Sequence, residues 1–77
     1  MTQYKNLGGN SSVVAYEYDA MSIRVQFKDN SVYEYTNEKP GAKEVSIMIK
    51  LAEIGQGLGG YINSNKNVRF GYARKIK

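Results

Sequence analysis

The 77-residue sequence contains no cysteine, no histidine and no tryptophan. Without cysteine, disulfides and thiolate metal sites are excluded. Without histidine, the chain also lacks the common zinc ligand and the usual general base at neutral pH. Ser11, Ser12 and Ser31 therefore have no histidine to activate them as nucleophiles. We expect a protein that is not an enzyme and that binds no metal and no cofactor.

Long hydrophobic runs are absent as well. No stretch approaches the ~18 apolar residues of a membrane span. The first nine residues, MTQYKNLGG, contain no apolar core of a signal peptide. We expect a single domain, cytoplasmic and without a membrane partner.

The net charge of +4 is unevenly distributed. After residue 60 the chain has five basic side chains and no acidic one, namely Lys66, Arg69, Arg74, Lys75 and Lys77. Residues 1 to 60 hold the other six basic and all seven acidic side chains. The basic character therefore belongs to the C-terminal segment, residues 64 to 77.

The clearest pattern in the chain is SIRVQFKDNSVYEYT, residues 22 to 36, which predicts a β-hairpin. A two-residue loop at Asp29-Asn30 would pair apolar with charged side chains. A three-residue loop, residues 28 to 30 with Asn30 in the left-handed conformation, avoids this. This register pairs Val25 with Tyr33, Ile23 with Tyr35, Phe27 with Ser31, Gln26 with Val32 and Arg24 with Glu34. Tyr33 and Tyr35 then share one apolar face with Ile23, Val25 and Phe27.

Residues 13 to 18, VVAYEY, are typical of a strand. A turn at residues 19 to 22, in which Asp19 bonds the backbone, pairs Tyr18 with Ile23. This register puts Val14, Tyr16 and Tyr18 on the apolar face of the hairpin.

From Ala42 the apolar spacing becomes helical. Val45, Met48, Ile49 and Ala52 form one stripe, which Ile47, Leu51 and Ile54 widen. The glycine-rich run at residues 55 to 60 ends the helix. Its spacing matches G-x-G-x-x-G, but it follows a helix instead of a strand, so we interpret it as a cap and a flexible turn. Val68, Phe70 and Tyr72 alternate with other residues and predict an extended segment or a short fourth strand.

These patterns predict an α+β fold, a three-stranded antiparallel β-meander with one α-helix packed on one face and a C-terminal extended segment or short strand. Residues 1 to 10 are expected to form a flexible lead, residues 11 to 63 the β-β-β-α domain, and residues 64 to 77 a basic segment.

Several short motifs occur along the chain in a set order and spacing, namely Ser11-Ser12, Tyr18-Asp19, Phe27, Val32-Tyr33-Glu34-Tyr35, Ala52 and Gly60-Tyr61-Ile62-Asn63. Together they resemble the KTSC domain, a short module found at the C-terminus of some lysyl-tRNA synthetases and as a stand-alone bacterial protein. Two features depart from that family: Asp29-Asn30 replaces an Asn-Gly turn, and a longer glycine run replaces Ser-x-Gly after the helix. The resemblance implies the fold and, through the association with a synthetase, RNA binding. It implies no active site.

The first functional hypothesis is a small non-enzymatic module that binds RNA or another single-stranded nucleic acid. Aromatic rings stack on bases, and basic side chains contact phosphates. The stacking candidates are Tyr33 and Tyr35, and the phosphate candidates are Arg24, Lys28, Lys66, Arg69, Arg74 and Lys75. The competing interpretation is that both tyrosines belong to the core beneath the helix, with their hydroxyls at its rim.

The alternative function is a protein-interaction or homodimerisation module. An apolar patch of Ile47, Leu51 and Ile54 on the helix would then remain exposed and contact a protein or a second copy of the chain. The same residues would be buried if the domain uses them in its only core, and the sequence does not separate these two possibilities.

Overall fold

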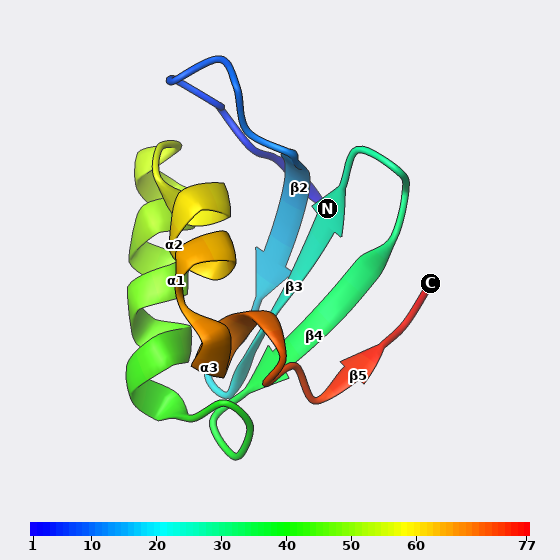
Figure 1. Ribbon diagram of the computed structural model, residues 1–77, viewed down its shortest axis with the longest axis vertical. Coiled ribbons are helices and arrows are strands. Elements are labelled where there is room, and N and C mark those ends of the chain that lie inside the picture. Colours follow the sequence, from blue (N-terminus) through cyan, green and yellow to red (C-terminus); the bar gives the residue numbers. More distant parts are fainter.

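The computed structural model describes all residues from 1 to 77. A five-stranded antiparallel sheet, in the order β1-β2-β3-β4-β5, carries three helices on one of its sides (Figure 1). The elements are β1 (Thr2–Gln3), β2 (Val13–Tyr18), β3 (Ser22–Phe27), β4 (Val32–Thr36), α1 (Ala42–Ile54), α2 (Leu58–Ser64), α3 (Lys66–Arg69) and β5 (Arg74–Lys75). The predicted α+β class is confirmed, with more strands and more helices than the sequence indicated.

The register of the β3–β4 hairpin is the predicted one. Val25 pairs with Tyr33, Ile23 with Tyr35 and Arg24 with Glu34. Asn30 has a φ of 71°, the left-handed conformation that a three-residue loop with a bulge requires. The loop turns both tyrosines toward the helices and Glu34 toward the outer face.

One detail of the first strand differs from the prediction. Tyr18 pairs with Ile23 as expected, but a β-bulge interrupts the ladder between Val13 and Ala15. A bulge inserts one extra residue and changes which side chains face the core. Val13 is therefore buried in place of Val14. Tyr18, at the other end of the strand, keeps its predicted register but is exposed.

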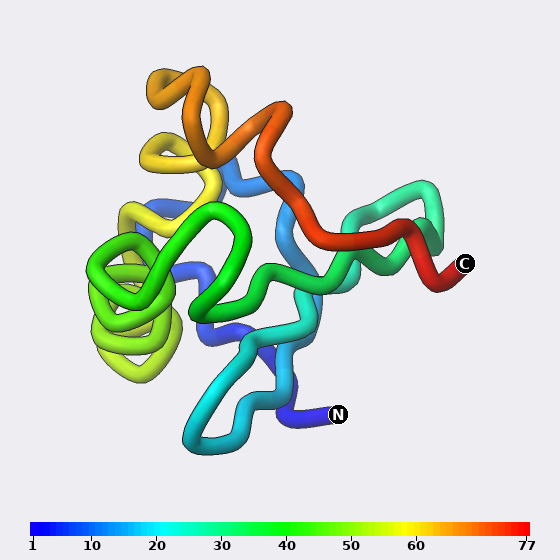
Figure 2. The backbone as a smooth tube through the Cα atoms, turned by 90° about the horizontal axis from the view of Figure 1, so that it is seen from below, coloured from blue at the N-terminus to red at the C-terminus, as the bar shows by residue number.

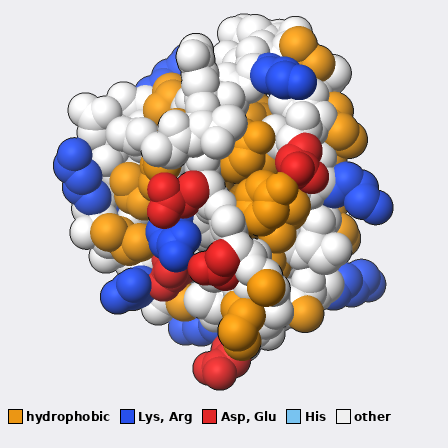
Figure 3. Space-filling view, turned by 180° about the vertical axis from the view of Figure 1, so that it is seen from behind, with side chains coloured by type: hydrophobic (Ala, Val, Ile, Leu, Met, Phe, Trp, Pro, Cys, Tyr) orange, Lys and Arg blue, Asp and Glu red, His pale blue; other side chains and the backbone are white.

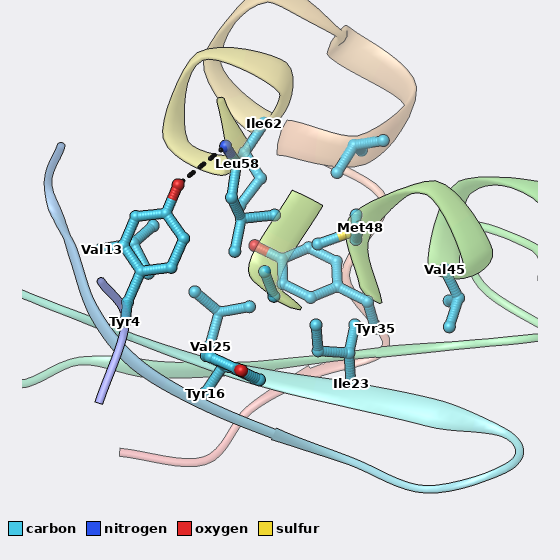
Figure 4. Packing of buried hydrophobic residues seen from close by; sticks show 12 residues of the cluster. Tyr4, Val13, Tyr16, Ile23, Val25, Tyr35, Val45, Met48, Leu58 and Ile62 are labelled. Carbon is cyan, nitrogen blue, oxygen red and sulfur yellow. Dashed lines mark hydrogen bonds between the residues drawn. The ribbon is translucent and has the colours of Figure 1, made fainter. Parts of the chain in front are cut away.

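The core lies between the sheet and the helices (Figure 4). From α1 the core takes Val45, Met48 and Ala52, the centre of the predicted stripe. Ile49 and Leu51 pack against it in part, and Ile54 is exposed. At about 1.5–3 kcal/mol for each large apolar side chain fully buried, this contact is the main favourable term in folding.

The N-terminus differs from the expected flexible lead. β1 pairs with β2, and Tyr4 is only 3% exposed. The Tyr4 hydroxyl accepts a hydrogen bond from the backbone N–H of Leu58 at 3.2 Å (Figure 4). Tyr4 therefore connects the first residues to the start of α2. No local sequence pattern predicts a contact between residues this far apart in the chain.

The segment after α1 also differs from the sequence prediction. Gly55 ends α1 in the left-handed conformation, as expected of a cap, but Leu58 then begins a second helix where we expected a flexible turn. Val68, assigned to an extended segment, lies in α3 and is fully buried. Leu58, Ile62 and Val68 all join the core, so packing outweighs the low helix propensity of the glycines.

The fourth predicted strand lies further along the chain than expected. It is β5, at Arg74–Lys75, and it pairs with β4 through Tyr33↔Lys75 and Glu34↔Arg74. Figure 2 shows this C-terminal segment returning beside β4 after the helices. β5 thus forms one edge of the sheet, and β1 forms the other.

The substitution Tyr4→Phe tests the contact between the N-terminus and α2. It removes the acceptor and leaves the buried Leu58 N–H without a partner, at a cost of about 1–2 kcal/mol. We expect urea denaturation followed by circular dichroism to show this loss. For a domain of this size, the melting temperature should fall by about 4–8 °C for each kcal/mol.

Tyr61→Phe is the matched control, because it removes a hydroxyl from a half-buried ring that packs against the same core. A melting temperature that changes equally in the two variants would contradict the role assigned to Tyr4.

Candidate functional site

A cleft of about 580 Å³ opens between the β3–β4 loop and the segment that joins α3 to β5. Aromatic, basic and hydroxyl-bearing side chains line it together. The lining consists of Ser12, Phe27, Lys28, Asp29, Ser31, Tyr33, Tyr35, Ile62, Asn63, Arg69, Phe70 and Tyr72. We call it the aromatic cleft.

Backbone contacts hold the two sides of the aromatic cleft in place. The N–H of Lys28 donates to the carbonyl of Ser12 at 2.8 Å, which joins the hairpin to the start of β2. On the other side, Gly71 lies so close to α3 that a Cβ atom there would stand 1.9 Å from the carbonyl oxygen of Asn67. Only glycine allows the chain to leave α3 at this point and to carry Phe70 and Tyr72 along the cleft.

Three aromatic rings form the inner wall. The Tyr33 ring meets the Tyr72 ring at a centroid distance of 4.7 Å and an interplanar angle of 71°. It meets the Phe27 ring at 5.8 Å and 80°. Both are edge-to-face arrangements, which stabilise aromatic pairs beyond simple burial. Tyr33 is thus partly engaged by its neighbours.

Tyr35 has a different environment. Its side chain is 2% exposed and lies in the core among Ile23, Met48 and Leu58 (Figure 4). Burial, together with the nearby Tyr33 and Tyr72 hydroxyls, raises the pKa of Tyr35 well above the tyrosine range, so the hydroxyl stays protonated at all ordinary pH values. The ring cannot stack on a ligand while the helices cover it.

The most exposed aromatic ring of the cleft is Phe70, at 66%. The guanidinium carbon of Arg69 lies 5.3 Å from its centroid, within the range of a cation–π contact. Our sequence interpretation placed Phe70 in an extended segment or short strand and did not count it as a site residue. The available signal was an aromatic residue directly after an arginine in the basic segment.

The predicted phosphate contacts divide into separate groups. Lys28 and Arg69 line the aromatic cleft. Lys75 pairs with Tyr33 across the sheet, and its Nζ lies 5.7 Å from the Tyr33 centroid, so it is on the same face. Lys66 is exposed on α3 but is not among the residues that line the cleft.

Arg24 and Arg74 lie on the outer face of the sheet instead. Glu34 binds both, with its carboxylate oxygens 3.3 Å from Nε of Arg24 and 2.8 Å from Nε of Arg74. Arg24 also contacts Glu17 and Asp19. Figure 3 shows acidic and basic side chains directly against one another on the back of the molecule. Neither arginine is brought together with the tyrosines of the cleft.

Asp29 is the one acidic residue of the cleft lining. Hydrogen bonds from the side chain and then the backbone of Ser31 hold the pKa of Asp29 below its usual range, and the positive charge of Lys75 acts in the same direction. The lining carries a net positive charge, because it contains Lys28 and Arg69 and only one acidic residue, Asp29.

The structure contains no group of three or more histidine, cysteine, aspartate or glutamate side chains placed to hold a metal ion. None of its helices is long and apolar enough to cross a membrane.

Comparisons with protein-family models, with curated proteins and with solved structures found no match to this chain.

The raised pKa of Tyr35 predicts alkaline unfolding. Above about pH 10 the unfolded chain loses the Tyr35 proton while the folded protein retains it, so stability is unaffected below that pH and falls as the pH rises further. We expect Tyr35→Phe to reduce this loss in denaturant titrations at pH 8 and about pH 11. An equal loss in the variant and the parent protein would show that Tyr35 is not responsible.

Proposed function

We propose that this protein is a non-enzymatic module that binds single-stranded RNA at the aromatic cleft. The observation that carries the proposal is the exposed Phe70 ring beside Arg69, at the edge of a cleft whose other side contributes Lys28. An exposed ring next to cations is the combination that single-stranded nucleic acids require.

Phe70 supplies the stacking surface in this proposal. Stacking of a base on an aromatic side chain contributes about 1–3 kcal/mol and tolerates any base, since every base has a π face. Tyr33, which packs edge-to-face with Tyr72 and Phe27, supports the wall of the cleft. Tyr35 supports the wall from the core and does not contact the RNA in this proposal.

Lys28 and Arg69 contact phosphates from the two sides of the cleft. Neither forms an ion pair within the protein, whereas Arg24 and Arg74 are occupied by Glu34. Lys75, over the Tyr33 ring, and the exposed Lys66 of α3 add positive charge outside the cleft lining. Because phosphate contacts release counterions, binding should weaken steeply as salt increases.

The resemblance to the KTSC domain agrees with this location. Half of the cleft lining consists of residues that carry the resemblance, namely Ser12, Phe27, Tyr33, Tyr35, Ile62 and Asn63. We propose that the shared motifs build this cleft.

A protein-interaction function has less support. Leu51 packs against the core and Ile47 is half-buried, so Ile54 is the one exposed member of the expected patch of Ile47, Leu51 and Ile54. One exposed isoleucine is ordinary for a protein surface and marks no interface.

The substitution Phe70→Ala tests the proposal in a fluorescence anisotropy titration with labelled single-stranded RNA of about ten nucleotides. Loss of one stacking contact should weaken binding by about tenfold at low salt, since 1.4 kcal/mol corresponds to a factor of ten. The parent protein should itself lose affinity between low and moderate salt.

Met21→Ala provides the matched control. Met21 is 63% exposed, close to the value for Phe70, and it lies at the β2–β3 turn away from the cleft. Its affinity should equal that of the parent protein. Absence of any anisotropy change with the parent protein at low salt would refute RNA binding, and an equal loss in both variants would refute the location.

A further inference from the structure

The last residues of the chain contribute Tyr72 to the lining of the aromatic cleft and attach to the sheet at β4. Residues 72 to 77, which we call the C-terminal strap, make backbone hydrogen bonds to β4. The N–H of Ala73 donates to Glu34 and the N–H of Ile76 to Val32, both at 2.7 Å, and Val32 donates to Lys77 at 3.1 Å. The regular strand within the strap is only two residues long, so its backbone pairing alone is a weak attachment.

Glu34 supplies a second attachment on the outer face. Its carboxylate accepts a hydrogen bond from Nε of Arg74 at 2.8 Å, the shortest of the ion-pair contacts in the structure. The Glu34 side chain is 12% exposed, whereas Arg74 is 68% exposed. The carboxylate is thus fixed between Arg24 and Arg74, and the strap reaches it from the solvent side.

Two side chains of the strap lie on the cleft side of the sheet, opposite to the outer face that carries Glu34. Lys75, the neighbour of Arg74, points to the cleft side and stands over the Tyr33 ring. Tyr72 packs edge-to-face against the same ring. Because neighbouring residues of a strand point to opposite faces, the contact of Arg74 with Glu34 on the outer face also places Lys75 over Tyr33. Tyr72 precedes the strand, and the hydrogen bond from the next residue, Ala73, to the Glu34 carbonyl holds it beside Tyr33.

We infer that Glu34 is a positioning residue for the aromatic cleft, which it shapes from the outer face of the sheet by holding Arg74 and with it the C-terminal strap. The effect of this contact on ligand binding rests on the proposed function. The attachment of the strap to β4 is independent of the proposed function, because it is measured without any ligand.

The substitution Glu34→Gln separates this role from simple electrostatics. It raises the net charge by one, so a general attraction between protein and RNA would become stronger. Loss of the attachment predicts the opposite, an affinity about twofold to fivefold weaker, the range expected for one partly exposed ion pair. The probe is the labelled RNA of about ten nucleotides, in the anisotropy titration.

Amide hydrogen exchange on the ligand-free protein gives the second readout. In Glu34→Gln, the Ala73 and Ile76 amides should exchange about twofold to fivefold faster, while the amide of the buried Val25 is unchanged. Arg24→Gln is the control, because it removes the other partner of Glu34 and leaves the contact with Arg74. It should leave the exchange of Ala73 and Ile76 as in the parent protein.

A double-variant comparison checks that the two residues act through each other. Arg74→Gln should accelerate exchange as much as Glu34→Gln, and the double variant, whose net charge equals that of the parent protein, should be no faster than either single variant. Arg74→Lys, which keeps the positive charge, should restore most of the protection.

The outcomes are distinct. Unchanged exchange of Ala73 and Ile76 in Glu34→Gln overturns the attachment, whatever the RNA result. Faster exchange with unchanged RNA affinity overturns the effect on the cleft. If the parent protein binds no RNA, the proposed function fails, and exchange alone then supports or overturns the role of Glu34 in holding the strap.

Discussion

The register of the β3–β4 hairpin determines which side chains the rest of the molecule can use. A slip of β4 by one residue would turn Tyr33 and Tyr35 to solvent and bring Glu34 beneath the helices, where its charge would lose both its hydration and its partner Arg24. Asn30, in its left-handed conformation, fixes the loop that prevents this slip. The two faces of the sheet then acquire separate chemistry, with aromatic packing inside and an ion-pair network outside.

The remaining segments assemble around this hairpin from distant parts of the chain. Ser12 bonds the hairpin loop at Lys28, α2 and α3 cover Tyr35, and the C-terminal strap lies against β4. Their meeting point is the aromatic cleft. The outer face neutralises Arg24 and Arg74 through Glu34, so the basic character of the C-terminal segment is divided between the two sides of the sheet. On the cleft side, Lys28 and Arg69 form no ion pair within the protein.

The parts of the fold that the sequence predicted are those with local causes. Alternation and loop chemistry predicted the hairpin register, and helical spacing predicted α1 from Ala42 to Ile54. The missed parts depend on contacts across the chain. Tyr4 is placed by the N–H of Leu58, and α2 forms despite its glycines because Leu58 and Ile62 complete the core. The bulge that buries Val13 instead of Val14 likewise leaves no periodic signal.

The candidate site was predictable only in part for the same reason. Composition indicated aromatic and basic residues, and Lys28, Tyr33 and Arg69 do line one cleft. Sequence proximity of basic residues did not reveal that Arg74 and Lys75 face opposite sides of a sheet, because their placement depends on the pairing of β5 with β4. Phe70 was assigned to an extended segment or short strand, and its exposure follows from the tight passage of Gly71 past α3.

Backbone amide NMR during titration with short single-stranded RNA tests the central claim most directly, since it reports on every face of the sheet at once. The proposed site predicts that the largest shifts occur at residues that line the aromatic cleft, Lys28, Asn63, Phe70 and Tyr72, while Glu17 and Ala20 near the outer face and the β2–β3 turn stay in place. Shifts concentrated on the outer face, or no shifts at low salt, would contradict it.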